Sequence, residues 1–424
     1  MSLIVTKFGG TSLATPQRVQ SAAQRLVAYH NQGKRVVAVV SAMGSATDSL
    51  LALAKSVNPH PPARELDMLL ATGEQVSMSI VAMAIEALGI RAMSFTGPQA
   101  GILTTNVHNK ATISELQCDR IHAALDTGHI VIVAGFQGVT QSGDITTLGR
   151  GGSDTTAVAL AAGLGAELCE IYSDVDGIYT CDPRIVPRAH KLKEISFEEM
   201  LELAASGAGV LQMRAVEFAR NFKVPLHCRS AFSNANGTFV KEATMEQAIV
   251  SGIAFDKSET KVTIRNVPDQ LGIAAEVFGA IAQTGVNVDL IVQNISEHGF
   301  TDISFTVPTG DLEKIQPVCD ELVIKLGANE YEVNDSIAKV SIVGAGMKSN
   351  PGIAAKMFKV LADNGVNISM ISTSAIRISV VIDKSFVERA ANALHTAFGL
   401  DSTEVFEETL LSPEELTAKA NKGR

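Results

Sequence analysis

Up to residue 231, the chain alternates short apolar runs with longer segments rich in Ala and Leu. The short runs are almost entirely apolar and largely β-branched, as in Val36–Val40, Ile130–Ala134, Leu168–Tyr172 and Pro225–Cys228. Uninterrupted apolar strands separated by helices are typical of a parallel sheet that is covered on both faces. The pattern therefore predicts an α/β fold with a mainly parallel, doubly wound sheet.

Beyond residue 260 the pattern changes to an internal repeat. The string Gly-Ile-Ala-Ala at Gly272–Ala275 recurs at Gly352–Ala355, and Gly-Val-Asn at Gly285–Asn287 recurs at Gly365–Asn367. The offset is the same in both cases, and such sustained register indicates a duplicated domain. Each copy reads strand, helix, strand, strand, helix, which predicts two ferredoxin-like βαββαβ domains.

The second copy lacks an obvious final strand after Leu400. Residues Ala248–Ala254 could supply that strand, which would make the first copy an insertion within the second. We therefore divide the chain into a first domain at 1–231, a turn-rich linker at 232–247, a first repeat at 261–335, a second repeat at 248–260 and 336–411, and a charged tail at 412–424.

Polar clusters follow the apolar runs at Lys7–Ser12, Ser41–Thr47 and Ser173–Asp176. In parallel α/β sheets, ligands bind outside the carboxyl ends of the strands. The first cluster reads Lys-Phe-Gly-Gly-Thr-Ser, and a lysine beside glycines at the start of a helix is typical of a phosphate site. It is not a Walker A loop, because no G-x-x-x-x-G-K-[ST] string occurs in the sequence. A tight turn with a surface lysine is the alternative interpretation.

A second glycine-rich cluster, Gly149–Asp154, reads Gly-Arg-Gly-Gly-Ser-Asp. It precedes an Ala-rich helix predicted at Thr155–Gly163, which Ser153 or Asp154 would cap. Arg150 stands among the glycines, and arginine suits planar recognition of a carboxylate or a phosphate. A plain glycine loop with a capping aspartate is the alternative.

Acidic residues provide further candidates. Ser173–Tyr179 and Asp182–Arg184 offer carboxylates for ribose hydroxyls, adenine amino groups or a phosphate-bound Mg²⁺, although Asp and Gly are also common turn residues. Glu74 follows a glycine at the start of an apolar helix. It either complements the helix dipole or binds a substrate ammonium group.

Composition limits the classes of function. A length of 424 residues predicts about three domains, and the net charge of −10 argues against a nucleic acid partner. The five cysteines form no CxxC pair and the nine histidines show no metal spacing, so we expect neither disulfides nor a protein metal site. We find no signal peptide and no apolar stretch of about 18 residues. We therefore expect a cytoplasmic protein with no membrane partner.

In combination, these motifs resemble those of the aspartate kinases (aspartokinases) of the amino-acid kinase superfamily, over nearly the whole chain. The repeats are similar to the paired ACT domains of the two-ACT aspartokinases. Ahead of them, the markers stand in the family's order at Lys7–Ser12, Val40–Gly44, Gly73-Glu74, Gly149–Asp154, Ser173–Gly177 and Asp182–Arg184. The resemblance implies transfer of the γ-phosphoryl group of ATP, with its Mg²⁺, to the β-carboxylate of L-aspartate, giving 4-phospho-L-aspartate.

The resemblance also implies roles for single residues. Lys7 would stabilise the transferring phosphoryl group with help from the backbone N–H groups of Gly9 and Gly10, and Asp154 would organise that lysine and the phosphates. The aspartate would be held through its α-carboxylate by Arg150, through its α-ammonium by Glu74, and by the hydroxyl groups of Thr47 and Ser153. The nucleotide would be bound by Lys7, Phe8, Gly9, Gly10, Ser41, Ser173, Asp174, Tyr179, Asp182 and Arg184.

The sequence departs from the family at Gly209, where relatives commonly carry a lysine that contacts phosphate. Either Arg214 or another cation substitutes for that lysine, or this enzyme turns over more slowly. The departure predicts that Gly209→Lys raises kcat.

ACT domains of this family bind lysine, threonine or both as inhibitors. The binding positions carry over to Asp269, Gly272, Ile273, Ala274, Asn287, Val288, Asp289, Gln293 and Asn294, and in the second copy to Ile353, Ala354, Asn367, Ile368, Ser374 and Ala375. Turn formation explains the repeated Gly and Asn residues equally well. The resemblance further implies a homo-oligomer through the ACT domains and a possible separate regulatory subunit from an internal start near Met245.

Two other functions fit parts of the sequence. The chain could be another amino-acid kinase, acting on glutamate or acetylglutamate. It could also be a catalytically weak amino-acid sensor that kept its ACT function, which Gly209 favours. The presence of Lys7, Glu74, Arg150, Asp154 and Asp174 favours an active kinase.

Overall fold

The computed structural model describes residues 2–243, 248–293 and 299–401. The chain forms two compact units. Among the described residues, the first unit comprises 2–179, 191–205 and 209–243, and the second comprises 180–190, 206–208, 248–293 and 299–401. The second unit therefore contains a short excursion of the chain that leaves the first unit after Tyr179 and returns at Lys191.

The first unit is built on an eight-stranded sheet with the order β10-β12-β11-β9-β1-β2-β6-β3 among the described strands. Its neighbouring strands are parallel except for β11 and β12. The predicted mainly parallel α/β sheet is confirmed. The strands are β1 (Leu3–Phe8), β2 (Arg35–Val40), β3 (Ala92–Phe95), β6 (Ile130–Ala134), β9 (Leu168–Ser173), β10 (Glu194–Ser196), β11 (Leu226–Ser230) and β12 (Thr238–Lys241).

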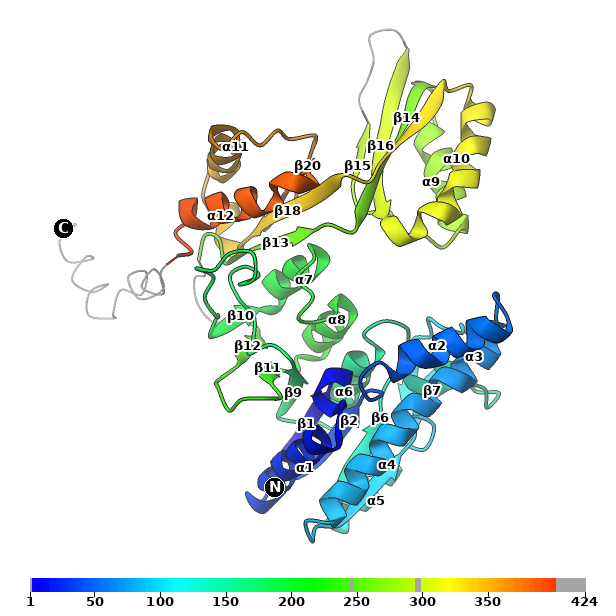
Figure 1. The fold of residues 1–424 in the computed structure, drawn as a ribbon, viewed down its shortest axis with the longest axis vertical. Helices are drawn as coiled ribbons and strands as arrows, with labels where there is room; N and C mark the ends of the chain where they lie inside the picture. The colour runs from blue at the N-terminus through cyan, green and yellow to red at the C-terminus, as the bar shows by residue number, and fades with distance from the viewer. Residues whose placement is uncertain (1, 244–247, 294–298, 402–424) are drawn as a thin grey trace, which may run out of the picture. The chain divides into compact units, whose positions relative to one another are not determined.

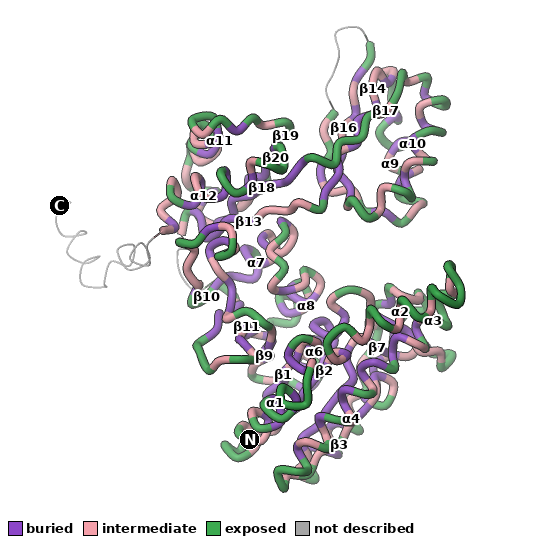
Figure 2. The backbone as a smooth tube through the Cα atoms, viewed as in Figure 1, coloured by how far each residue is buried: buried purple, intermediate pink, exposed green. Residues whose placement is uncertain are grey.

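Helices cover both faces of this sheet (Figure 1). On one face, α1 (Pro16–Asn31) and α4 (Thr72–Glu86) lie beside each other and pack on Ile4 and Phe8 of β1. On the other face, α6 (Gly152–Gly163) packs against β1, β2 and β9. Strand residues point alternately to the two faces, so Lys7 points to the side of α6. The central strands are mostly buried (Figure 2). The remaining helices are α2 (Ala46–Val57), α3 (Ala63–Leu70), α5 (Asp119–Asp126), α7 (Phe197–Ala205) and α8 (Met213–Phe222).

A small second sheet in the first unit was not predicted from the sequence. It has the order β5-β4-β7-β8, with β4 (Ile102–Thr104), β5 (Ile113–Leu116), β7 (Gln137–Val139) and β8 (Ile145–Thr147). Strands of three or four residues leave little periodicity to detect. Helix α3 packs against β8, and this contact becomes important for the site.

One helical run, Ala63–Glu86, is long and apolar enough to cross a membrane by length and composition alone. The expectation that no apolar segment reaches that length is therefore wrong for the described residues. Core helices pass the same test, and here Val81 and Ile85 are buried in the core of the first unit.

The second unit holds the two repeats, and the described residues of each form a four-stranded sheet and two α-helices. The first sheet has the order β15-β16-β14-β17 and the second β13-β18-β20-β19. The first repeat contains β14 (Glu259–Pro268), α9 (Ile273–Gln283), β15 (Ile291–Gln293), β16 (Phe300–Pro308), α10 (Leu312–Leu326) and β17 (Glu330–Asn334). The second contains β13 (Gly252–Asp256), β18 (Ile337–Val343), α11 (Ile353–Asp363), β19 (Met370–Thr373), β20 (Arg377–Asp383) and α12 (Val387–Ala397).

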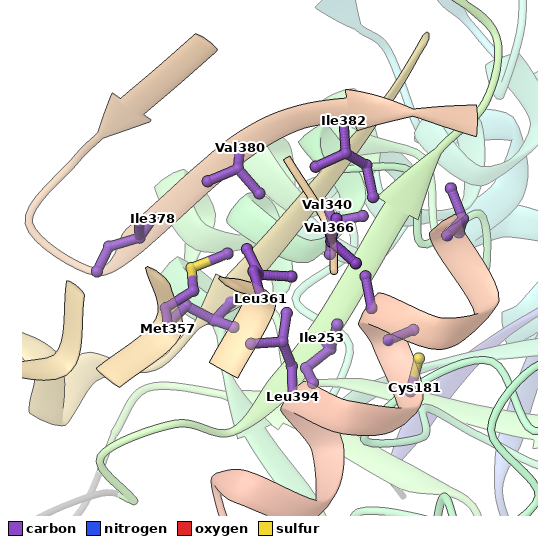
Figure 3. Close-up of a cluster of buried hydrophobic side chains, with 14 of the residues drawn as sticks. Cys181, Ile253, Val340, Met357, Leu361, Val366, Ile378, Val380, Ile382 and Leu394 are labelled. Carbon is purple, nitrogen blue, oxygen red and sulfur yellow. The ribbon is translucent and has the colours of Figure 1, made fainter. Parts of the chain in front are cut away.

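The core of the second repeat includes side chains from the excursion at 180–190. Cys181 and Val186 are buried in the cluster formed by α11, α12 and the sheet, with Ile253 of β13 and Leu394 of α12 (Figure 3). Thr180 and the fully buried His395 are joined by a hydrogen bond of 2.9 Å between Oγ1 and Nε2. This excursion is therefore part of the hydrophobic core of the repeat.

Candidate active site

A cavity of about 340 Å³ in the first unit is lined by many of the predicted site residues. Its walls come from the ends of β1 and β2, the start of α4, and the loop that leads into α6. The predicted residues that line it are Lys7, Gly10, Ser41, Thr47, Glu74, Arg150, Ser153 and Asp154. Because β1 is paired with β2 on one side and with β9 on the other, their carboxyl ends meet at one sheet edge, as a parallel sheet requires.

Lys7 and Asp154 form an ion pair on one wall of the cavity. The distance from Lys7 Nζ to Asp154 Oδ1 is 2.5 Å, and the side chains are only 13% and 9% exposed. The strand alternation turns Lys7 toward α6, and Asp154 stands in the first turn of that helix. The predicted partnership of these two residues is present in the structure.

The glycines after Lys7 differ in what they offer a ligand. The Gly9 N–H donates to the Tyr172 carbonyl at 3.2 Å, so this backbone group has a protein acceptor instead of a phosphate. Gly10 lines the cavity, and a Cβ there would come within 2.7 Å of the Ala42 carbonyl oxygen. Gly10–Leu13 form a short 3-10 turn, whereas the expected helix begins later, at Pro16. The predicted helix start at the glycines is therefore wrong.

Phe8 contributes no side chain to the cavity. Its ring is buried and stacks on Tyr172, with 4.8 Å between the ring centroids. Its carbonyl accepts from the Ser41 N–H at 3.1 Å, which joins the ends of β1 and β2. Its place in the structure is in the core.

The Arg150 loop owes its path to left-handed backbone conformations. Gly149 and Gly151 have φ of 75° and 72°, values that glycine adopts without steric cost. Gly151 is also the residue that precedes α6, in place of the predicted Ser153 or Asp154 cap. Neither of those side chains makes a capping bond, and both line the cavity instead.

Glu74 is the most unusual group in the cavity. Its side chain is buried, and Oε1 accepts the Ala42 N–H at 3.0 Å. Within the described part of the chain, Oε2 is buried and has no hydrogen-bond partner. Burial raises the pKa of Glu74 to about 7, against a smaller opposing effect of the Ala42 N–H. A buried carboxylate that lines a cavity and has an oxygen without a donor is suited to a cationic ligand.

The residues predicted for the nucleotide are only partly brought together. Ser41 lines the cavity. Ser173 Oγ accepts the Val175 N–H at 3.3 Å in a turn, and Asp174 is exposed. Tyr179 lies at intermediate exposure at the end of the first unit's chain segment.

Asp182 and Arg184 belong to the second unit, where they contact each other. Arg184 Nη2 and Asp182 Oδ2 are 2.6 Å apart, and Arg184 Nε donates to the same carboxylate. Hydrogen bonds from Arg184 lower the pKa of Asp182. Their predicted nucleotide role stays a prediction.

Arg214 was considered above as a substitute for the phosphate-contacting lysine, but in the structure it binds backbone carbonyl groups. Its guanidinium donates to the carbonyl oxygens of Leu148 at 2.8 Å and Ala111 at 2.9 Å, and it does not line the cavity. Burial lowers its pKa. Gln212 lines the cavity instead, and no sequence signal distinguished it. At Gly209 a Cβ would meet no atom within 4 Å, so the position is open.

No group of three or more His, Cys, Asp or Glu side chains suited to a metal ion is present among residues 2–243, 248–293 and 299–401. A magnesium ion that accompanies ATP takes most of its ligands from phosphates and water and one or two from carboxylates. Asp154 in the cavity fits that requirement.

Comparison with known proteins assigns the two parts of the chain. Residues 2–230 match the amino acid kinase family, and residues 262–322 and 340–398 each match an ACT domain. The aspartokinase of Corynebacterium efficiens is 52% identical over 411 residues, covering 95% of this chain and 98% of the relative. The aspartokinase of Mycobacterium tuberculosis is 52% identical over 415 residues with the same coverage. The chain belongs to the aspartokinase family.

A solved structure supports the same assignment. Escherichia coli aspartokinase III in complex with aspartate and ADP is 27% identical, covers 93% of this chain and 99% of its own, and superposes with a TM-score of 0.80. This aspartokinase is therefore an ATP-dependent kinase with an amino-acid kinase domain followed by two ACT domains.

The two ACT repeats of this aspartokinase present the predicted effector positions on matching backbones. Gly272 and Gly352 precede α9 and α11 with φ of 93° and 92°. Asp289 of the first repeat is ion-paired with Lys339, which is 2% exposed on β18 of the second. Of the other predicted positions, Ile273, Ala274, Ile353 and Ala354 lie in the first turns of α9 and α11, Gln293 ends β15, and the rest lie in loops. Asn294 falls outside the described residues, as does Met245, the predicted internal start.

Proposed function

We propose that this aspartokinase transfers the γ-phosphoryl group of MgATP to the β-carboxylate of L-aspartate, giving 4-phospho-L-aspartate. The observation that supports the acceptor is the presence of both Glu74 and Arg150 in the lining of one small cavity that also holds Lys7 and Asp154. An α-amino acid carries an ammonium and a carboxylate, which Glu74 and Arg150 complement.

Glu74 binds the ammonium group through its unpartnered oxygen. In the free protein, burial favours the neutral acid and raises the pKa to about 7. A bound ammonium favours the charged carboxylate, because an opposite charge within about 4–6 Å lowers the pKa of an acid. Arg150 binds the α-carboxylate, and the hydroxyl groups of Thr47 and Ser153 complete the contacts to the substrate.

Lys7 neutralises the charge of the phosphoryl group during transfer. Phosphoryl transfer asks the protein mainly for positioning and electrostatic stabilisation. The β-carboxylate of aspartate is already ionised at neutral pH, so the reaction needs no general base. Asp154 holds the Lys7 ammonium at 2.5 Å and so fixes its direction.

The nucleotide would lie near the ends of β1, β2 and β9, against Gly10, Ser41 and the turn that begins at Ser173. The close approach of Gly10 to Ala42 leaves backbone, without side chains, at this wall. Asp154 would hold Mg²⁺ together with the phosphates; the ion would supply positive charge to the β- and γ-phosphates.

Coupled measurement of ADP release tests the proposal, with L-aspartate, L-glutamate and N-acetylglutamate as acceptors and a reaction without acceptor. We expect release that depends on L-aspartate. A preference for glutamate or N-acetylglutamate would assign another amino-acid kinase, and no release with any acceptor would leave an amino-acid sensor.

We further propose that lysine, threonine or both inhibit the enzyme at the ACT repeats. The duplicated glycine turns at Gly272 and Gly352 support two related sites. The proposal includes a cytoplasmic homo-oligomer through the ACT domains and a shorter regulatory product from Met245. Initial rates with each amino acid alone and with both together test the inhibition, and an immunoblot for a short C-terminal product tests the internal start.

A further inference from the structure

Asp67 is a fully buried carboxylate that does not line the cavity. It lies on α3, and both of its oxygens are occupied. Thr147 Oγ1 donates to Oδ1 at 2.5 Å, the Asn109 N–H lies 3.1 Å from both oxygens, and His108 Nδ1 is 2.7 Å from Oδ2. One carboxylate thus connects α3, the loop at 108–109 and strand β8.

The partners of Asp67 support the start of the Arg150 loop. Strand β8 ends at Thr147, three residues before Arg150. Asn109 has a φ of 64°, a left-handed conformation that is uncommon outside glycine. Its carbonyl oxygen would be 2.9 Å from a Cβ at Gly149. The backbone held by Asp67 therefore packs directly against the residue that precedes Arg150.

The same carboxylate is close in sequence to Glu74. Helix α3 ends at Leu70 and α4 begins at Thr72, so Asp67 and Glu74 lie on nearly continuous helical backbone. The junction is held by Gln137 Nε2, which donates to the Ala71 carbonyl at 2.8 Å. Asp67 therefore ties the helix that carries Glu74 to the strand that leads to Arg150.

We infer that Asp67 is a positioning residue that sets the separation between the ammonium-binding and carboxylate-binding groups of the acceptor site. This inference rests on the proposed function of Glu74 and Arg150. Arg64 Nε and Asp144 also join α3 to the β7–β8 hairpin, at 2.8 Å, but this ion pair lies on the exposed side, whereas Asp67 is fully buried. Positioning errors near 1 Å are enough to change catalytic parameters strongly.

Asp67→Ala removes all of these bonds and is the main test. We expect the aspartate KM to rise about tenfold or more, with kcat and the ATP KM changed less than about threefold. Thr147→Val removes one bond and Asp67→Asn keeps an acceptor oxygen, so both should raise the aspartate KM by less. Asp144→Ala is the matched control, because it breaks a tie between the same elements away from Arg150, and its aspartate KM should stay within about twofold.

Amide hydrogen exchange of the Leu148–Gly152 peptide gives a readout that needs no substrate. Exchange should accelerate in Asp67→Ala and not in Asp144→Ala. The inference would be overturned by unchanged exchange in Asp67→Ala or by equal effects of Asp67→Ala and Asp144→Ala. It would also be overturned if Asp67→Ala lowered kcat and raised the KM values of aspartate and ATP to a similar degree. If the wild type does not use aspartate, the proposed function fails, while the exchange comparison still decides the role of Asp67. If Asp67→Ala does not fold, Asp67→Asn and Thr147→Val carry the same comparison.

Discussion

The kinase cavity and the pair of ACT repeats treat buried charge in opposite ways. In the cavity, Glu74 is buried with one oxygen that has no protein partner in the described chain, and burial raises its pKa to about 7. In the repeats, the ammonium of Lys339 is 2% exposed and is paired with Asp289, with Glu259 4.0 Å away. The cavity therefore holds a buried ionisable group that lacks a protein partner for one oxygen, whereas the repeats hold a buried charge that is ion-paired.

This difference in pairing distinguishes Glu74, which is suited to binding a ligand, from Lys339, which stabilises the folded repeats. An unpaired buried carboxylate destabilises the free protein and is compensated when a ligand arrives. A buried ion pair adds little net stability compared with apolar residues, but losing one partner is strongly destabilising. Substitutions in the cavity should therefore impair kinetics without lowering stability, and substitutions at Lys339 should lower stability.

The largest kinetic effect is expected at Lys7. Lys7→Ala removes the cavity's charge for the transferring phosphoryl group and should lower kcat by about 10³-fold, as for the loss of one strong electrostatic group in a transition state. Steady-state ADP release measures kcat. Lys55→Ala, on the exposed side of α2, is the control and should retain wild-type turnover. A Lys7→Ala enzyme that keeps most of its kcat would contradict the assigned role.

The largest stability effect is expected at Lys339. Lys339→Met keeps the aliphatic volume but leaves Asp289 and Glu259 uncompensated, at a cost of about 3 kcal/mol in the free energy of unfolding. Burial already raises the pKa of Glu259, and Lys339 opposes that rise. Without Lys339 its pKa rises further, so the destabilisation should be greater at pH 8 than at pH 5.

Urea unfolding at both pH values measures this effect. The control is Lys314→Met, which removes an exposed ion pair with Asp311 and should change stability by less than about 0.5 kcal/mol. Equal losses for the two variants would show that burial does not set the contribution of the Lys339 ion pair to stability.

Glu74→Gln should affect kinetics and stability in opposite directions. The variant loses the charge for the substrate ammonium, so kcat/KM for aspartate should fall about 100-fold. The pKa of Glu74 in the folded chain, about 7, exceeds its ordinary value of 4.5. Its contribution to stability is therefore present below about pH 4.5 and is lost as the pH rises through 7.

The ligand-free Glu74→Gln protein should consequently be more stable than the wild type at pH 8, by roughly 2–3 kcal/mol, and no more stable near pH 4.5. In the wild type, kcat/KM for aspartate should rise with pH up to about 7, because Glu74 must be ionised to bind the ammonium. Glu86→Gln, an exposed position on the same helix, controls for the substitution. A stability difference independent of pH would exclude Glu74 as its source.

The smallest effect is expected at Gly209. A Cβ at Gly209 would meet no atom within 4 Å, and a lysine there that contacts the phosphates should raise kcat a few-fold, within about 1 kcal/mol. Gly209→Met supplies a side chain of similar length without charge and should leave kcat unchanged. The same gain in both variants, or in neither, would show that charge at this position does not assist transfer.

Much of the fold and part of the site follow from local sequence patterns. Apolar runs predict the strands of the main sheet, and the rule for strand ends brings Lys7 and Ser41 to one cavity. These predictions succeed because strand periodicity and the crossover geometry of a parallel sheet involve neighbouring residues and a single topology.

Other features depend on partners that are distant in sequence. Nothing in the sequence around Asp67 distinguishes it from other helix residues. Its contacts are with His108 and Thr147, which lie 41 and 80 residues further along the chain. The Gly9 N–H is likewise taken by Tyr172, on the neighbouring strand β9. No local pattern specifies such contacts, because their register is set by tertiary packing.

The excursion at 180–190 places a native cysteine where its reactivity depends on the packing of the second repeat. Cys181 is buried in the core of that repeat, where burial raises its thiol pKa to about 12. Thiols react with alkylating reagents as thiolates, so Cys181 is protected for as long as the excursion stays packed. Any transition that withdraws this segment would be recorded as alkylation at a single native cysteine, without a label introduced into the protein.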